Sequence, residues 1–226
     1  MKIILFIFYI ILIVSCAPVP ISEIQTAKLI PKSSKQYTPY FSLGFDSTKL
    51  ISREIGFQIA KGESDLVNSR LKIHYSDFTN FSSIYIGGGK KYQLFIDEGA
   101  ENSIFTSLYL PFSLIYFIDK DFHTLIQYPP PRFTFEPTIL LTIGNNIFDI
   151  TSSLKVILLS SSASWREPRT ANYKDSDVLH VFNLGLSLNV WDESYLHIES
   201  GWLAERKFLH FNKLKHYSVG FIYKQF

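Results

Sequence analysis

The sequence predicts an all-β protein, an antiparallel meander closed into a single transmembrane barrel of about eight to ten strands. Segments in which apolar and polar residues alternate recur along the chain after residue 36. Aromatic residues make up 16% of the chain and charged residues only 19%, a balance that suits β-structure. The connections between the later segments alternate between short and long, as the turns and loops of membrane barrels do.

The first fifteen residues predict export. A single Lys2 is followed by an apolar run over residues 3–14. A helix that spans a bilayer needs roughly 20 apolar residues, so the shorter run is interpreted as a signal peptide, residues 1–15, that is removed.

The quartet Ile13-Val14-Ser15-Cys16 resembles the lipobox of bacterial lipoproteins. The resemblance implies cleavage before Cys16, attachment of lipid such as palmitate to its thiol, and handling by the lipoprotein-processing machinery. The alternative is an ordinary signal peptide cleaved before Pro18, although proline is poorly suited to that position. Cys16 is the single cysteine, so no disulfide can form within the domain.

Residues 16–36 are predicted to be a lipid-anchored tether, and residues 37–226 the barrel domain. The tether prediction depends on Pro18, Pro20 and Pro31 and on the polar run that follows them. The alternative is that part of this segment folds back as a plug or an extra strand.

The first half of the domain contains four alternating segments and one that is apolar on both faces. In the fourth segment, Gly87-Gly88-Gly89 predicts either a kinked long strand or a hairpin. The segment 103–118 contains Pro111, which requires an edge, a bulge or a bend. The apolar faces of the alternating segments are Tyr37, Phe41, Leu43 and Phe45; Ile55, Phe57 and Ile59; Val67, Leu71, Ile73 and Tyr75; and Ile84, Ile86, Tyr92, Leu94 and Ile96.

The second half repeats the pattern, with long connections at 119–131 and 164–177 and tight ones at 144–146 and 192–193. Loops on rigid scaffolds usually carry recognition, so the two long connections are the predicted binding surface. The apolar faces are Phe133, Phe135, Ile139, Leu141 and Ile143; Phe148, Ile150, Leu154, Val156 and Leu158; Val178, His180, Phe182, Leu184, Leu186, Leu188 and Val190; Leu196, Ile198, Trp202 and Ala204; and Tyr217, Val219, Phe221 and Tyr223.

Alternation alone leaves open which face points outward. Aromatic strand ends such as Phe133 and Trp191 favour a membrane barrel. The final Phe226 resembles the last residue of outer-membrane barrel proteins, which implies insertion by the barrel-assembly machinery, although it is out of phase with Tyr223. The alternative is a soluble β-sandwich or lipocalin-like barrel tethered at the periplasmic face, but its first strand has Gly44-Phe45-Asp46 where lipocalins have Gly-x-Trp.

If the apolar faces meet lipid, polar residues fill the lumen. Buried charges there must pair, which predicts an ion-paired network that stiffens the barrel. The predicted lumen network comprises Glu54, Arg70, Lys72, His74, Arg132, Glu136, Asn183 and Asn189.

A sharper hypothesis is a lipid-modifying hydrolase. His197 or His216 would act as the base, Glu199 would orient it, and Ser218 would be the nucleophile. This set resembles that of outer-membrane lipid A deacylases, whose His-x-Ser-Asn motif is absent here.

We therefore predict an outer-membrane lipoprotein with a structural or surface-binding role and no readable ligand. The net charge of +2 provides no basic field for nucleic acid. No motif indicates a metal or a cofactor.

Overall fold

The computed structural model describes residues 22–46, 49–78, 81–99, 101–119, 132–159, 178–191, 194–205 and 211–225. None of these segments forms a helix long and apolar enough to cross a bilayer. The strands are β1 (Lys35–Asp46), β2 (Lys49–Ser64), β3 (Val67–Phe78), β4 (Phe81–Glu98), β5 (Ser103–Asp119), β6 (Arg132–Phe135), β7 (Thr138–Gly144), β8 (Phe148–Leu159), β9 (Val178–Trp191), β10 (Ser194–Glu205) and β11 (Phe211–Gln225).

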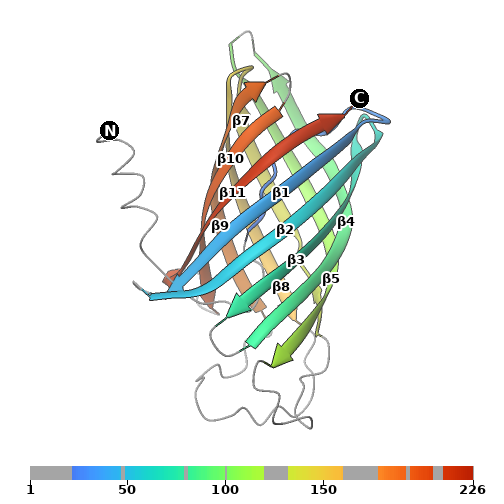
Figure 1. The fold of residues 1–226 in the computed structure, drawn as a ribbon. Helices are drawn as coiled ribbons and strands as arrows, with labels where there is room; N and C mark the ends of the chain where they lie inside the picture. The colour runs from blue at the N-terminus through green and yellow to red at the C-terminus, as the bar shows by residue number, and fades with distance from the viewer. Residues whose placement is uncertain are drawn as a thin grey trace, which may run out of the picture.

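The strands form a closed cylinder (Figure 1). Strands that are neighbours around the ring pair antiparallel, and the ring is closed by β1 against β11, from Lys35 opposite Gln225 to Asp46 opposite Leu214. The short strands β6 and β7 share one position between β5 and β8, so the wall has ten strand positions. Closure leaves no sheet edge unpaired. The predicted antiparallel barrel is confirmed.

The wall is interrupted between β6 and β7, where Glu136 lies beside Pro111 of β5 and is followed by Pro137. Glu136 and Pro137 separate β6 from β7, so the predicted continuous strand from Phe133 to Ile143 is divided. Proline cannot donate to a ladder. The carbonyl of Pro111 accepts the Glu136 N–H at 3.0 Å, and the carbonyl of Pro137 accepts the Val156 N–H at 3.0 Å. On the other side of β5, the glycine run belongs to one long strand, β4, and makes no hairpin.

The barrel has two distinct ends. The end that we call the turn end carries the connections at 65–66, 99–102, 145–147 and 192–193, together with Lys35 and Gln225 (top of Figure 1). The opposite end, here called the loop end, carries the other connections except Glu136 and Pro137, which lie within the wall. The predicted long connections 119–131 and 164–177 join strands at the loop end and, apart from Asp119, lie outside the described residues.

The outer surface is apolar and the lumen mostly polar. Along β2 the burial alternates residue by residue, with outward side chains such as Ile55, which is 64% exposed. Phe112 and Phe133 are 67% and 65% exposed on the same outer surface. An apolar exterior around a polar interior is favourable in lipid and unfavourable in water. The soluble barrel and the sandwich are therefore wrong, and the fold is that of a transmembrane β-barrel.

Candidate functional site: a charged lumen filled by the N-terminal segment

The lumen is occupied by residues 22–34, here called the lumen segment. Ser22, Glu23, Ile24, Gln25 and Ala27 are all buried. Most of this part of the chain has no regular secondary structure, so its backbone groups need partners from the wall.

The prediction of a tether over residues 16–36 is wrong for residues 22–36, and the alternative of a plug describes residues 22–34. The two residues Lys35 and Gln36 begin β1. The physical reason is that the wall supplies charged and polar partners for this segment, which the proline content alone did not reveal. Residues 1–21, including the predicted signal and Cys16, lie outside the described residues.

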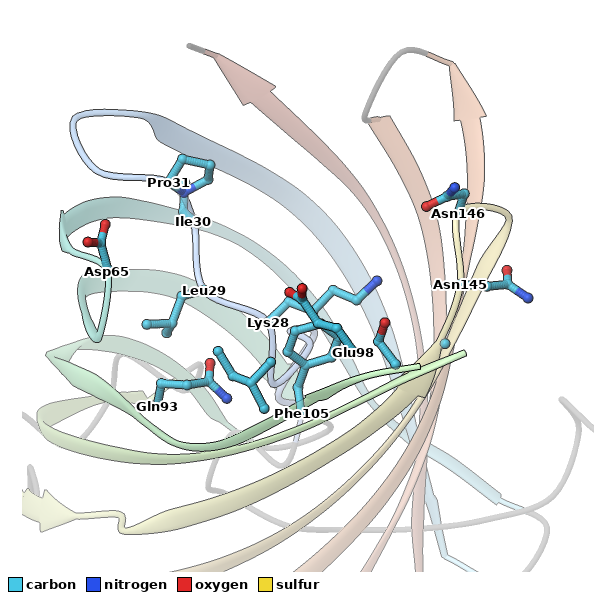
Figure 2. A pocket seen from close by; sticks show the side chains of 13 residues that line it. Lys28, Leu29, Ile30, Pro31, Asp65, Gln93, Glu98, Phe105, Asn145 and Asn146 are labelled. Atoms are coloured by element: carbon cyan, nitrogen blue, oxygen red, sulfur yellow. The ribbon is translucent and has the colours of Figure 1, made fainter. Parts of the chain in front are cut away.

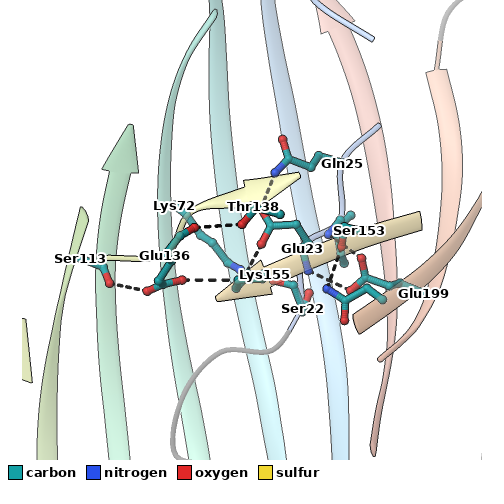
Figure 3. Close-up of polar contacts among 12 residues, drawn as sticks. Ser22, Glu23, Gln25, Lys72, Ser113, Glu136, Thr138, Ser153, Lys155 and Glu199 are labelled. Carbon is teal, nitrogen blue, oxygen red and sulfur yellow. Dashed lines mark hydrogen bonds and ion pairs between the residues drawn. The ribbon is translucent and has the colours of Figure 1, made fainter. Parts of the chain in front are cut away.

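An ion-paired centre holds the start of the lumen segment. The ammonium of Lys155, on β8, lies 2.5 Å from the Glu23 carboxylate and 3.6 Å from that of Glu136 (Figure 3). Lys72, on β3, donates a hydrogen bond to the Ser22 carbonyl. Lys155 is 1% exposed, and such a buried charge is tolerated only when it is paired. The segment is thus held by charge as well as by shape.

Glu199, on β10, is a second anchor. Its carboxylate accepts the backbone N–H groups of Glu23 at 2.8 Å and Ile24 at 3.1 Å. The same carboxylate lies 3.1 Å from the Nε2 atom of His216 and 3.9 Å from that of His197. One wall carboxylate therefore joins two strands to the backbone of the lumen segment.

Further contacts follow the segment toward the turn end. Lys91 donates to the carbonyls of Thr26 at 2.8 Å and Lys28 at 2.7 Å. The Ala27 N–H donates to Thr142 Oγ1 at 2.6 Å. The Lys28 ammonium pairs with Asp149 at 2.6 Å.

A tight turn joins the lumen segment to the wall. The Ser34 N–H donates to the Pro31 carbonyl at 3.1 Å, and Ser33 has a positive φ of 70°, as one central residue of some tight turns requires. Gly62 of β2 lies against this turn, and its N–H donates to the Ser34 carbonyl at 3.0 Å. A methyl group at residue 62 would overlap the carbonyls of Pro31 and Ile30.

Gly62→Ala is expected to destabilise the barrel by about 1–3 kcal/mol, because the backbone of the turn has to shift to admit the methyl group. The measurement is the urea midpoint of the barrel in lipid vesicles. Lys61→Ala, at the exposed neighbouring position, is the control and should leave the midpoint near that of the wild type. Equal midpoints for the two variants would show that the turn does not pack as described.

Most of the predicted lumen residues lie in the lumen. Arg70 donates to Gln58 Oε1 at 3.4 Å, His74 Nδ1 lies 2.8 Å from the Tyr40 hydroxyl, and Asn183 donates to Ser153 at 3.2 Å. The buried members are Glu54, Arg70, Lys72, His74, Glu136 and Asn183.

Two members of the predicted network stand apart. Asn189 is exposed at the turn end, where its Nδ2 donates to the Asn146 carbonyl at 3.0 Å, so its placement in a buried network is wrong. Asn189 is in phase with the inward residues of β9, as predicted, but it lies at the turn end, where the lumen opens to water. Arg132 begins β6, and its side chain lies outside the described part of the structure.

The structure brings three of the four predicted hydrolase residues together. His197, Glu199 and His216 form the cluster described above, whereas the Ser218 hydroxyl accepts a hydrogen bond from Ser42 at 2.6 Å. The serine within hydrogen-bond distance of a histidine is instead Ser187, whose Oγ lies 2.7 Å from His197 Nδ1. Both oxygens of Glu199 already bind the lumen segment. The cluster thus acts as an anchor inside the lumen.

Sequence reasoning missed several residues that hold the segment. Lys155 and Asp149 lie on the inward face of an alternating strand, so their phase was the available signal. Glu23 and Lys28 lie in a segment without periodicity and gave no signal. The missed wall residues on inward faces also include Lys91, Thr142 and Ser187.

A cavity of about 450 Å³ opens at the turn end, beside the last residues of the lumen segment (Figure 2). Its lining combines charged side chains, Lys28 and Glu98, with the ring of Phe105. Among the residues that the structure describes, no group of His, Cys, Asp or Glu side chains is arranged to hold a metal ion.

No protein-family model and no curated protein matches the chain. Several solved barrels are similar in fold. The NanC porin shares 12% identity over 83% of this chain and 100% of its own, with a TM-score of 0.45. The N-terminal β-barrel domain of Pseudomonas aeruginosa OprF shares 11% over 85% and 98%, with a TM-score of 0.38. A de novo designed transmembrane β-barrel shares 10% over 87% and 98%, with a TM-score of 0.36.

Proposed function

We propose that the protein is an outer-membrane lipoprotein whose closed barrel has a structural or surface-binding role. The observation that carries this proposal is the filled lumen: the protein's own segment, fixed by the Lys155 and Glu199 contacts, takes the space that a diffusion pore would leave open. Recognition would then fall to the connections at the loop end, which face outward in outer-membrane barrels.

The lipoprotein part of the proposal depends on the lipobox-like quartet that ends at Cys16. Lipidation there would require the lipoprotein-processing machinery, and insertion of the strands would require the barrel-assembly machinery. Metabolic labelling with palmitate tests this part directly. The wild type should take up label and Cys16→Ser should not.

The barrel part is tested by electrophoresis of the membrane-extracted protein with and without boiling. A closed barrel resists detergent until it is heated, because the backbone groups of its wall are paired around the ring. We expect the unboiled protein from an outer-membrane fraction to migrate faster than the boiled protein. A single band at the full mass in both samples would contradict the proposal.

Two earlier alternatives have less support. A lipid-tethered periplasmic binding cup needs an apolar inner cavity, whereas the lumen of this barrel is filled mostly by polar and charged side chains, and many large apolar side chains are exposed on the outer surface. A lipid A hydrolase needs an accessible nucleophile, whereas Ser218 and Ser187 are buried in the lumen. Comparing lipid A from cells that carry the wild type or His216→Gln tests the second alternative, and identical lipid A in both would agree with our proposal.

A further inference from the structure

At the turn end, β4 continues beyond its pairing with β3. The last pair of that ladder joins Val67 to Tyr92, and the Gln93 N–H then donates to the Leu66 carbonyl at 3.0 Å. From residue 94 to residue 98, β4 has β5 as its neighbour on one side, and no other strand of the described residues pairs with it on the other side. These five residues, here called the rim edge, lie beyond the closed part of the ring and are all exposed. A strand with one free side is a template for a further strand.

A β-bulge decides which side chains of the rim edge face the lumen. The register between β4 and β5 shifts between Gln93 and Phe95. The Gln93 side chain holds the bulge, since its Nε2 donates to the Phe95 carbonyl at 2.7 Å. After the shift, Ile96 and Glu98 line the cavity at the turn end, whereas Asp97 between them does not. A strand added along the rim edge would therefore place every second side chain over this cavity.

The cavity beside the rim edge has an apolar part and an acidic part. Leu29 and Ile30, at the end of the lumen segment, and Ile96 provide aliphatic side chains. Asp65, in the connection between β2 and β3, and Glu98 provide carboxylates (Figure 2). An added strand would thus meet both kinds of partner with the side chains of one face.

The two carboxylates are available to a cation from outside. Neither Asp65 nor Glu98 forms an ion pair with another residue that the structure describes. Lys28, which also lines the cavity, is already bound elsewhere. Its ammonium lies 2.6 Å from the Asp149 carboxylate and 5.3 Å from the centre of the Phe105 ring. The cavity therefore favours a ligand that carries positive charge.

The charge of the rim edge also disfavours a second copy of this chain as the added strand. Two copies paired along their rim edges would bring Asp97 and Glu98 of each copy close together. Like charges on neighbouring strands are destabilising, and charged residues on an edge are a common protection against such pairing. A different chain with Lys or Arg at the matching position would instead be attracted.

We propose that the rim edge binds an extended segment of another protein by strand addition, and that this segment has an apolar residue and a Lys or Arg two positions apart on its cavity-facing side. The apolar side chain packs on Leu29 and Ile96, and the cation pairs with Glu98 or Asp65. The short turns of outer-membrane barrels face the periplasm, so the partner is a periplasmic protein. This location rests on the proposed function, whereas the binding mode does not.

The test measures binding of a fluorescent peptide, Thr-Val-Thr-Lys-Thr-Val-Thr with blocked termini, to the folded barrel in non-ionic detergent. Its alternation places the lysine and both valines on one face for either strand direction. We expect saturable binding by fluorescence anisotropy, and an affinity about tenfold lower when glutamate replaces the lysine. Methylation of the backbone nitrogens of the peptide should also lower the affinity about tenfold, because it removes the donors of the added strand.

Two variants of the barrel locate the site. Glu98→Gln should weaken binding of the lysine peptide about threefold, and the double variant with Asp65→Asn about tenfold. Asp97→Asn, the neighbour that does not line the cavity, is the matched control and should leave the affinity near that of the wild type.

Several results would overturn the proposal. They are equal affinities of the lysine and glutamate peptides, equal affinities of the methylated and unmethylated peptides, and equal losses in Glu98→Gln and Asp97→Asn. A barrel that is dimeric in detergent and binds no peptide would mean that a second copy covers the rim edge. The assay uses purified protein, so its outcome is independent of the membrane in which the barrel resides and of lipidation.

Discussion

Replacing Lys155 by methionine should destabilise the barrel by about 3–5 kcal/mol, because removing one partner leaves buried charge uncompensated. The Lys155 ammonium lies between the carboxylates of Glu23 and Glu136, and all three side chains are almost fully buried. Methionine keeps the length of the side chain and removes the charge. The expected result is a large fall in the temperature at which the unboiled, fast-migrating form converts to the unfolded form.

A matched control is available at the turn end. Lys90 and Glu63 form an exposed ion pair at 2.8 Å, so Lys90→Met should change the conversion temperature little. Adding Glu23→Gln and Glu136→Gln to Lys155→Met should recover part of the loss, since neutral amides do not repel each other. A Lys155→Met barrel as stable as the wild type would mean that the ion-paired centre contributes nothing.

Deleting residues 22–30 should convert a closed barrel into a conducting one. The deletion keeps the turn at 31–34 and all the strand pairings, so the wall should still form. It removes the backbone bound by Glu199 and Lys91, and water can then hydrate these charged side chains. In planar bilayers we expect steady current through the deleted protein and a closed baseline for the wild type.

The matched test is to restore the segment from outside. A synthetic peptide with the sequence of residues 22–30 should reduce the current of the deletion protein. A peptide in which Glu23 and Lys28 are replaced by glutamine should do so less, because both ion pairs with the wall are lost. A deletion protein that remains heat-modifiable but carries no current would refute the role of the segment as the plug.

The wall of this barrel could be predicted well from the sequence because period-two alternation fixes which side chains share a face. In β2, Ile55 and Phe57 point outward and Glu54 and Gln58 inward, as their phase requires. The direction of the faces needed the structure, since a soluble barrel has the same alternation turned inside out. The exposure of apolar side chains such as Ile55 on the outer surface, with Glu54 buried inside, shows which direction holds.

The lumen segment could not be predicted with the same success. Its residues have no periodicity, and their partners come from strands up to 176 residues away, as with Glu23 and Glu199. Its prolines and polar residues correctly indicate a segment without regular secondary structure. Composition does not reveal whether such a segment lies outside the barrel, as a tether, or inside it. The break between β6 and β7 was difficult to predict for the same reason, since it involves Pro111 on the neighbouring strand β5 as well as Pro137 itself.

The pairing of β1 with β11, here called the seam, affects how the barrel assembles and how it unfolds. The lumen segment leaves the ribosome before any strand, whereas the strand that closes the ring around it, β11, comes last. Lys155 and Glu23 therefore lose their water only when the ring closes, so the cost of desolvation falls in the final step. Opening of the seam returns the same buried charges to water, and the lifetime of the folded barrel is then set by a rate of opening more than by an equilibrium.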